Sequence, residues 1–245
     1  MLQDKSKTYN ILFIGNSYTY YNGMPETIFA EIAKSAGYNV NVTSITKGGY
    51  YLDQHADPSD IKGAEVEARL SDAKWDYVIL QEQSTCAIND PQRFYGAVRN
   101  LVERIRANGA TPVLYETWGR KEGAAYLTEK GFISEAMTWK LAAGYTAIAE
   151  ELGIDIAYVG LAFMDVYSNY EDTIELYNAD KSHPSALGSH LAALTLFAKI
   201  FNSDLSDVTY SNAEYDPHAE ILKKAARKAV YETPAIPEEY KTLSK

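Results

Sequence analysis

The chain has a single cysteine among its 245 residues, Cys86, so it forms no disulfide within itself and no thiolate metal cluster. It also lacks an excess of basic residues, because 23 Lys and Arg stand against 33 Asp and Glu, for a formal net charge of −10. Binding to a phosphate backbone needs clustered Lys and Arg, so we expect no nucleic-acid partner. No apolar run approaches the roughly 20 residues of a membrane span, so we expect no span.

The first ten residues, MLQDKSKTYN, lack the apolar stretch of a secretory signal. Two interpretations of the compartment stay open. A native Met1 indicates a cytoplasmic protein, whereas a Met1 that replaces a removed export signal indicates a secreted or periplasmic one. The cysteine content does not separate them, since a secreted protein of this size can do without disulfides. The oligomeric state is equally open.

Short apolar runs alternate with helical patterns along the chain. The clearest helix follows Asp90, with Pro91 at its first position, Gly109 after its end and apolar residues at helical spacing between them. Strands separated by helices of this length predict parallel pairing in a three-layer α/β/α sandwich with a five-stranded sheet. The expected strands are 9–14, around 40–42, 76–80, 111–115 and 155–159, and the other expected helices are 25–35, 134–152 and one after 184.

We expect one domain over residues 1–245, because a chain of this length can bury one continuous core. That core is expected over about residues 9–202. From about 207 to 245 the sequence is polar, then helical around 219–231, then contains proline. This composition indicates a C-terminal surface segment.

Ser17 follows the first expected strand and Gly15-Asn16. In an open parallel sheet, ligands bind at the carboxyl ends of the strands, which is where this hydroxyl is expected. A lone serine after a strand is most often a turn or capping residue. The distant pair Asp180 and His183, three residues apart before the last expected helix, favours a different interpretation.

A serine hydroxyl is a weak nucleophile until a base takes its proton, and the base must be held in the right tautomer by an acceptor. A three-residue spacing lets one turn place the Asp180 carboxylate beside the imidazole of His183. We therefore predict Ser17 as nucleophile, His183 as base and Asp180 as the group that orients it. No arrangement of His and carboxylates supports zinc, so no metal site and no cofactor are expected.

Four segments in this order resemble the SGNH (GDSL-like) hydrolase superfamily: the strand and Gly-Asn-Ser of 11–17, the glycine loop at 48–49, the strand and polar loop of 76–84, and Asp180-x-x-His183-Pro184. The resemblance covers about residues 9–200. It implies a flavodoxin-like sandwich and a serine ester hydrolase with a Ser-His-Asp triad. It also implies an oxyanion hole built from the Ser17 amide, a glycine amide from Gly48 or Gly49, and a side-chain amide.

The chain departs from the common family pattern in two places. Gly-Asn-Ser replaces Gly-Asp-Ser, so Asn16 offers a neutral side chain. The Gly-x-Asn-Asp of the third loop is absent, and Gln81-Glu82-Gln83-Ser84 resembles the glutamine-containing loop of some carbohydrate acetylesterase branches. An oxyanion requires only an N–H donor, which a Gln provides. We favour Gln81, which is closest to the strand end, and keep Gln83 as the alternative.

The expected substrate is a small-molecule or carbohydrate ester, with an O-acetyl carbohydrate as the leading candidate. Twenty tyrosines are many for this length, and aromatic rings near the site are suited to stacking on sugars. Two other functions stay open: an acyltransferase that uses the same triad, and a non-catalytic glycan-binding module. The expected substrate-binding residues are Asn16, Tyr18, Tyr50 and Trp118.

Overall fold

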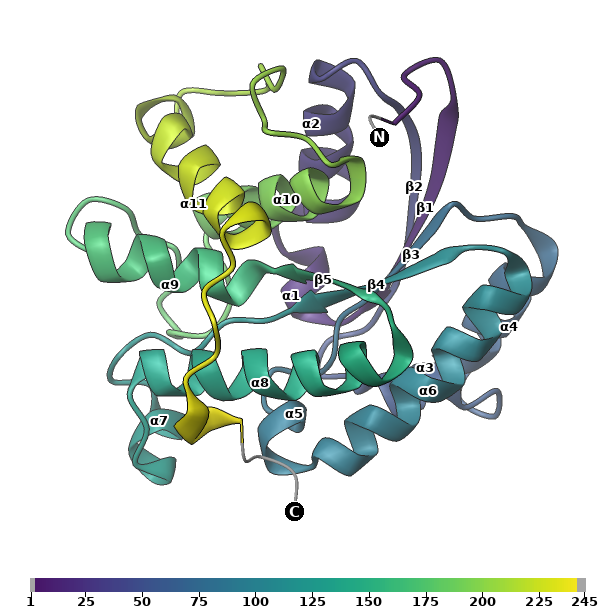
Figure 1. The fold of residues 1–245 in the computed structure, drawn as a ribbon, viewed down its shortest axis with the longest axis horizontal. Helices are drawn as coiled ribbons and strands as arrows, with labels where there is room; N and C mark the ends of the chain where they lie inside the picture. The colour runs from purple at the N-terminus through teal and green to yellow at the C-terminus, as the bar shows by residue number, and fades with distance from the viewer. Residues whose placement is uncertain (1–2, 242–245) are drawn as a thin grey trace.

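The structure, a computed structural model, describes residues 3–241. At its centre lies a sheet of five parallel strands in the order β2-β1-β3-β4-β5, which is the flavodoxin-like order (Figure 1). All five expected strands are present. They are β1 (Thr8–Gly15), β2 (Asn39–Thr46), β3 (Tyr77–Leu80), β4 (Thr111–Glu116) and β5 (Asp155–Tyr158).

Side chains of the sheet alternate between two apolar cores, as expected for strands buried on both faces. In β1, Ile11 and Phe13 enter one core, whereas Leu12 and Ile14 enter the other. Helices cover both faces (Figure 1). The first core is closed by α2 (Ala30–Ser35), α9 (Val159–Tyr170), α10 (Ala186–Phe201) and α11 (Ala219–Tyr231), and the second by α3 (Leu52–Ala56), α4 (Ile61–Asp72), α6 (Pro91–Asn108) and α8 (Ser134–Leu152). This is the three-layer α/β/α sandwich.

The capping signals of the sequence set the ends of α6. The Asp90 side chain accepts a hydrogen bond from the Arg93 amide at 3.2 Å, and Gly109 ends the helix with φ of 93°.

The helix expected over 25–35 differs, because its first part, Met24–Phe29, is wound as a π-helix before α2 begins. Short helices flank the loops at the carboxyl edge of the sheet: α1 (Ser17–Tyr20), Tyr21–Gly23, α5 (Cys86–Asn89) and α7 (Ala125–Lys130).

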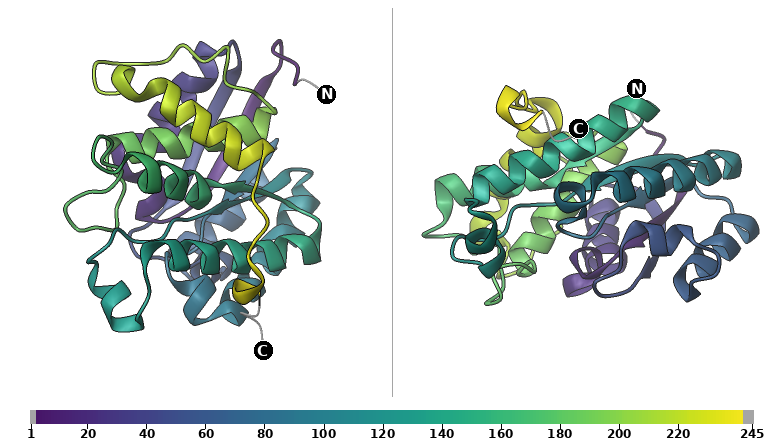
Figure 2. Two further views of the ribbon diagram at one scale, coloured as in Figure 1. Left: turned by 60° about the vertical axis from the view of Figure 1, so that its left-hand side comes forward. Right: turned by 90° about the horizontal axis from the view of Figure 1, so that it is seen from below.

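The C-terminal part of the chain is more embedded than expected. Leu222, Ala225, Ala226 and Ala229 of α11 are buried in the first core, against α9 and α10. Only the outer side of this helix is a surface, so the interpretation of 207–245 as a surface segment is wrong for α11. After α11 the chain crosses to α8 (Figures 1 and 2), where Lys140 lies over the ring of Tyr240.

Within residues 3–241, no helix combines the length and the apolar character that crossing a bilayer requires.

Candidate active site

The turn after β1 presents Ser17 at the start of a helix. Asn16 caps α1, since its side-chain oxygen accepts the Tyr18 amide at 3.1 Å. A Cβ at Gly15 would lie 2.5 Å from Thr19 Oγ1 and 2.6 Å from Gln81 Oε1, so a larger residue would displace the side chains that organise this turn. Ser17 therefore occupies the first position of α1, where the backbone N–H has no acceptor within the helix.

The Asp180–His183 loop is organised by its own carboxylate. Asp180 Oδ1 accepts the backbone amides of Ser182 at 3.0 Å and His183 at 2.9 Å. The amide of Asn178 donates to the His183 carbonyl at 2.8 Å, and Lys181 takes a left-handed conformation with φ of 60°. These bonds close the loop on itself directly before α10 and fix the direction of the His183 side chain.

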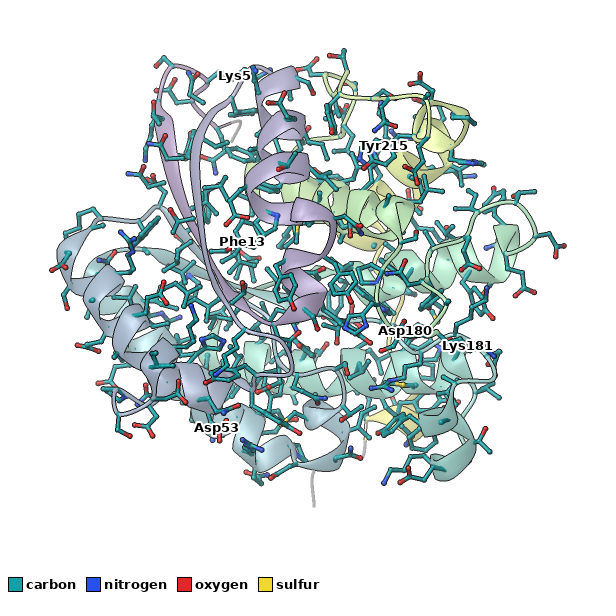
Figure 3. The ribbon with its side chains drawn as sticks, turned by 180° about the vertical axis from the view of Figure 1, so that it is seen from behind. Lys5, Phe13, Asp53, Asp180, Lys181 and Tyr215 are labelled. Atoms are coloured by element: carbon teal, nitrogen blue, oxygen red, sulfur yellow. The ribbon has the colours of Figure 1, made fainter. Side chains whose placement is uncertain are left out.

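The structure brings the three predicted triad residues into one chain of hydrogen bonds. His183 Nε2 lies 2.9 Å from Ser17 Oγ, and His183 Nδ1 is hydrogen-bonded to Asp180 Oδ2. Burial alone would raise the pKa of the Asp180 carboxyl, but hydrogen bonds from His183 and Ser182 hold it below its usual range. An ionised Asp180 keeps the proton of a neutral imidazole on Nδ1, which leaves Nε2 to accept from Ser17. Figure 3 labels Asp180 on its loop, next to Lys181.

Trp118 supports this loop from beneath. Its ring is sandwiched between Tyr18, at a centroid distance of 4.6 Å, and Phe163, at 4.1 Å. Its indole N–H donates to the Ser182 carbonyl at 3.0 Å, and the Tyr18 hydroxyl lies 2.6 Å from Ser182 Oγ. Trp118 is fully buried, so the expectation that it contacts substrate is wrong for this structure. It supports the Asp180–His183 loop instead.

A cavity of about 190 Å³ opens beside Ser17. Drug-sized ligands occupy pockets of roughly 300–1,000 Å³, so this one suits a small chemical group. Its walls come from the carboxyl ends of four strands and from the loop before α10. The lining residues are Asn16, Ser17, Tyr18, Gly49, Gln83, Ser84, Arg120, Ser182 and His183.

Gly49, and not Gly48, is the glycine that lines the cavity. It is the third residue of a turn closed by the hydrogen bond from the Tyr50 amide to the Lys47 carbonyl, 3.2 Å long. With φ of 73°, Gly49 adopts a conformation that side chains disfavour, which explains a glycine at this position.

Gln81, the favoured oxyanion donor, faces away from the cavity. Its Oε1 accepts the Asn16 amide at 2.9 Å and the Thr19 hydroxyl at 2.8 Å, while its Nε2 donates to the Glu82 carbonyl. Both ends of this buried amide are therefore engaged: the oxygen joins the first loop to the third, and the nitrogen bonds within the third loop. The sequence-based preference for Gln81 as the donor does not agree with this geometry.

Gln83 lines the cavity, and its amide oxygen is already engaged. Its Oε1 accepts the backbone amide of Thr85 at 2.8 Å and the hydroxyl of Thr85 at 3.0 Å. Because the oxygen is turned toward Thr85, the NH₂ end is the part of the side chain left for the cavity that Gln83 lines.

Glu82 holds the backbone between these two glutamines. It is fully buried, and its Oε1 accepts the Leu52 amide at 3.1 Å and the Gln83 amide at 2.5 Å. Burial raises the pKa of this carboxyl to about 8, which favours its protonated form near neutral pH. Nothing in the sequence pattern distinguishes this glutamate from an exposed one.

The remaining predicted contacts divide into two groups. Asn16 and Tyr18 line the cavity, although the Asn16 side chain is already engaged, since its Nδ2 donates to the Tyr50 carbonyl at 2.9 Å. Tyr50 does not line the cavity, and its hydroxyl accepts from Lys47 Nζ at 2.8 Å. Sequence reasoning missed Arg120, which lies two residues past Trp118 and enters the cavity wall.

The chain is similar in structure to several solved proteins. One, from Slackia heliotrinireducens, was assigned to the SGNH hydrolases; it is 34% identical over 79% of this chain and 100% of its own, with a TM-score of 0.69. A DUF4886 family protein from Bacteroides uniformis is 21% identical over 95% and 99% of the two chains, with a TM-score of 0.80. A catalytic mutant of an acetylxylan esterase from Geobacillus stearothermophilus is 13% identical over 83% and 95%, with a TM-score of 0.52. The last two show the fold alone. No family model and no curated protein matches the chain.

Proposed function

Because the chain belongs to the SGNH hydrolase superfamily, we propose that it is a serine esterase that cleaves O-acyl esters with Ser17, His183 and Asp180. The observation that carries the proposal is the continuous hydrogen-bonded chain from Ser17 Oγ through the imidazole to Asp180 Oδ2. The nucleophile and base are within reach of each other, and the base is oriented by a third group, as nucleophilic catalysis requires.

In the first half of the proposed reaction, Ser17 Oγ attacks the ester carbonyl while His183 Nε2 takes the hydroxyl proton. Asp180 stabilises the imidazolium that forms. The negative charge on the carbonyl oxygen is accepted by the Ser17 amide, the Gly49 amide and the Gln83 side chain. Donors fixed before the reaction lower the barrier because they need no reorganisation as charge develops.

In the second half, His183 gives its proton to the leaving alcohol, and an acyl group remains on Ser17. Water, deprotonated by the same imidazole, attacks this acyl-enzyme, and the acid leaves as Ser17 recovers its proton. Every proton in this cycle passes through His183, so the chemistry requires no cofactor. An acyltransferase differs only in that an alcohol replaces the water.

The size of the cavity supports a short acyl group. About 190 Å³ accommodates an acetyl or similarly small unit beside Ser17 and leaves little space for a long chain. The fold similarity to an acetylxylan esterase adds support for an O-acetyl carbohydrate as the substrate. We propose that the protein is a carbohydrate O-acetylesterase.

The test compares Ser17→Ala with the wild-type protein on p-nitrophenyl acetate and acetylated xylan. Loss of a triad residue costs roughly 10⁴ to 10⁶ in rate in other hydrolases, so we expect activity to disappear. The fold should remain intact, as read by circular dichroism. Ser206→Ala, an exposed serine bonded to Asp204, is the matched control.

A Ser17→Ala variant with more than about a tenth of the wild-type kcat would contradict the nucleophile assignment. A serine-directed organophosphonate should also label the wild-type protein at Ser17 and leave the variant unlabelled. Failure to label the wild type would favour the glycan-binding module. Acyl transfer to sugar acceptors in preference to water would favour the acyltransferase.

A further inference from the structure

The wall of the cavity contains a cation, Arg120, that ester hydrolysis by the triad does not require. Arg120 follows β4 and lines the cavity together with Ser17 and His183. One guanidinium nitrogen, Nη2, donates to Ser84 Oγ at 3.3 Å, and Cζ lies 5.2 Å from the ring centroid of Tyr126. The proposed triad chemistry assigns no role to this side chain.

Arg120 forms no ion pair with a carboxylate of residues 3–241, and its buried Nε has no hydrogen-bond partner. Arg93, Arg99 and Arg104 each pair with an Asp or Glu, whereas Arg106 and Arg227 donate to backbone carbonyls. Among the arginines of the described residues, Arg120 alone has a buried nitrogen without a partner. Carboxylates are not scarce in a chain of net charge −10. Burying a charged donor without a counter-charge costs free energy, so a guanidinium that has no carboxylate partner in a cavity wall indicates a ligand that supplies an anionic acceptor.

Within the described chain, the other residues that line the cavity contribute no carboxylate, because Asp180 lies behind His183. With a neutral imidazole, the cavity surface therefore has one full charge, and it is positive. A guanidinium presents a planar set of donors that matches a carboxylate in two parallel hydrogen bonds. The Ser84 hydroxyl beside it is a further donor for the same anion.

We propose that Arg120 binds a carboxylate of the substrate, so that the preferred substrate is an O-acyl ester with a carboxylate a few bonds from the scissile carbonyl. This inference rests on the proposed esterase function. A carboxylate on the alcohol narrows the O-acetyl substrate class, whereas a carboxylate on the acyl group would replace acetyl by a short dicarboxylic acyl group. The single small cavity holds both Ser17 and Arg120, which sets the short distance between ester and anion. The carboxylate belongs either to the acyl group, as in a dicarboxylic half-ester, or to the alcohol, as in an O-acetylated hydroxy acid or sugar acid.

Two matched substrate pairs test the inference and separate these sources. Monoethyl succinate against ethyl succinamate places the carboxylate or its neutral amide on the acyl side. Acetoxyacetate against acetoxyacetamide places it on the alcohol side. Acid release at constant pH gives kcat/KM for each substrate. We expect the wild-type protein to prefer the carboxylate at least about tenfold in one pair, as a charge-assisted bidentate contact implies. No preference in either pair overturns the proposal.

The variants Arg120→Gln and Arg120→Lys assign the preference to the guanidinium. Arg120→Gln should lower the carboxylate-to-amide ratio of kcat/KM by about tenfold or more, and Arg120→Lys should retain part of it. Lys121→Gln, which removes the same charge from a neighbouring side chain paired with Glu175, should leave the ratio unchanged. If Arg120 has only a structural role, Arg120→Gln lowers kcat/KM equally for the carboxylate and the amide, and their ratio does not change. That result would overturn the proposal.

Binding without turnover separates this inference from the esterase proposal. In calorimetry, the Ser17→Ala variant should bind the preferred carboxylate ester, and Ser17→Ala with Arg120→Gln should bind it at least about tenfold more weakly. Hydrolysis of p-nitrophenyl acetate without carboxylate preference contradicts only the role of Arg120. Arg120-dependent binding in a wild-type protein that hydrolyses no ester contradicts only the esterase.

Discussion

The ring of Tyr21 stacks on the imidazole of His183, with centroids 4.3 Å apart and 11° between the planes. The next residue anchors this contact, since Asn22 Nδ2 donates to the Ser185 carbonyl at 3.0 Å and to Ser189 Oγ at 2.8 Å. Ser17 and His183 are 166 positions apart in the chain. The segment after Ser17 therefore reaches across to the histidine loop and holds the imidazole of His183 beside Ser17.

Tyr21 is expected to be a positioning residue. Tyr21→Ala removes the surface on which the imidazole rests, and we expect kcat to fall by about tenfold with little change in KM, because small misplacements of a catalytic group are costly. Tyr21→Phe keeps the ring and should restore nearly wild-type kcat. Steady-state kinetics on p-nitrophenyl acetate measures both. Equal losses in the two variants would mean that the hydroxyl, and not the stacked ring, is what matters.

Asp180→Asn separates a triad carboxylate from an ordinary loop residue. Asp180 accepts hydrogen bonds from two backbone amides and from the His183 ring. An asparagine has one acceptor oxygen, so its NH₂ group faces either the two backbone amides or the imidazole. Where it faces the imidazole, the wrong tautomer is presented to Ser17 and kcat falls on the order of 10⁴.

The melting temperature of Asp180→Asn, measured with its kcat, decides the role of this residue. We expect a slow enzyme that has lost about 1 kcal/mol or less of stability. A variant that turns over normally but is clearly less stable would remove Asp180 from the triad and leave it as a structural cap of its loop.

We expect opposite effects from substituting Gln83 and Gln81, the first on kcat and the second on stability. Gln83→Ala should lower kcat by roughly 10² to 10³ with little change in KM or melting temperature, as for a donor used mainly in the transition state. Gln81→Ala leaves the Asn16 amide and the Thr19 hydroxyl without their acceptor, which should cost about 1–3 kcal/mol of stability. Kinetics and thermal unfolding of both variants test this. The reverse pattern would restore our sequence-based choice of Gln81.

The sequence predicts the fold well because its signals are local. A strand is indicated by the apolar run that forms it, and a helix end by a residue at or next to that end, as Pro91 and Gly109 do for α6. The positions of Ser17 and of the Asp180–His183 loop follow from the same pattern, since parallel strands all end at one edge of the sheet.

Properties that depend on side-chain direction could not be predicted in this way. Gln81 and Gln83 both follow β3 closely, and only packing decides that Gln81 turns into the loop junction while Gln83 lines the cavity. Trp118 is of a residue type that commonly lines pockets, but here it is buried beneath Ser182. Arg120 gave no signal, because a single arginine in a loop is most often on the surface.

The geometry explains why this chain has Asn16 where the common family pattern has an aspartate. Its side chain accepts the Tyr18 amide and donates to the Tyr50 carbonyl. An ionised aspartate in the common Gly-Asp-Ser pattern accepts but does not donate, so it could not make the second bond. The sequence shows the substitution, whereas the partner of its NH₂ group is visible only in the fold.

The buried carboxyl of Glu82 predicts how stability depends on pH. Its pKa in the folded protein is raised to about 8, from a reference value of 4.5, because burial disfavours the charge. Between these values the folded chain keeps a proton that the unfolded chain releases. The free energy of unfolding contributed by this group therefore falls as pH rises from about 4.5 to about 8 and is level outside that range.

Glu82→Gln should remove this pH dependence, since glutamine has the shape of the protonated acid and does not titrate. We expect the variant to gain stability relative to the wild type, on the order of a few kcal/mol, as pH rises through this window. Thermal or urea unfolding from pH 5 to pH 9 measures the difference, and Glu103→Gln, at an exposed position of α6, is the control. A constant difference between Glu82→Gln and the wild type across this range would mean that Glu82 is ionised in the folded protein. The amides of Leu52 and Gln83 would then bind a carboxylate, and the backbone beside the proposed oxyanion donor would be held by charge.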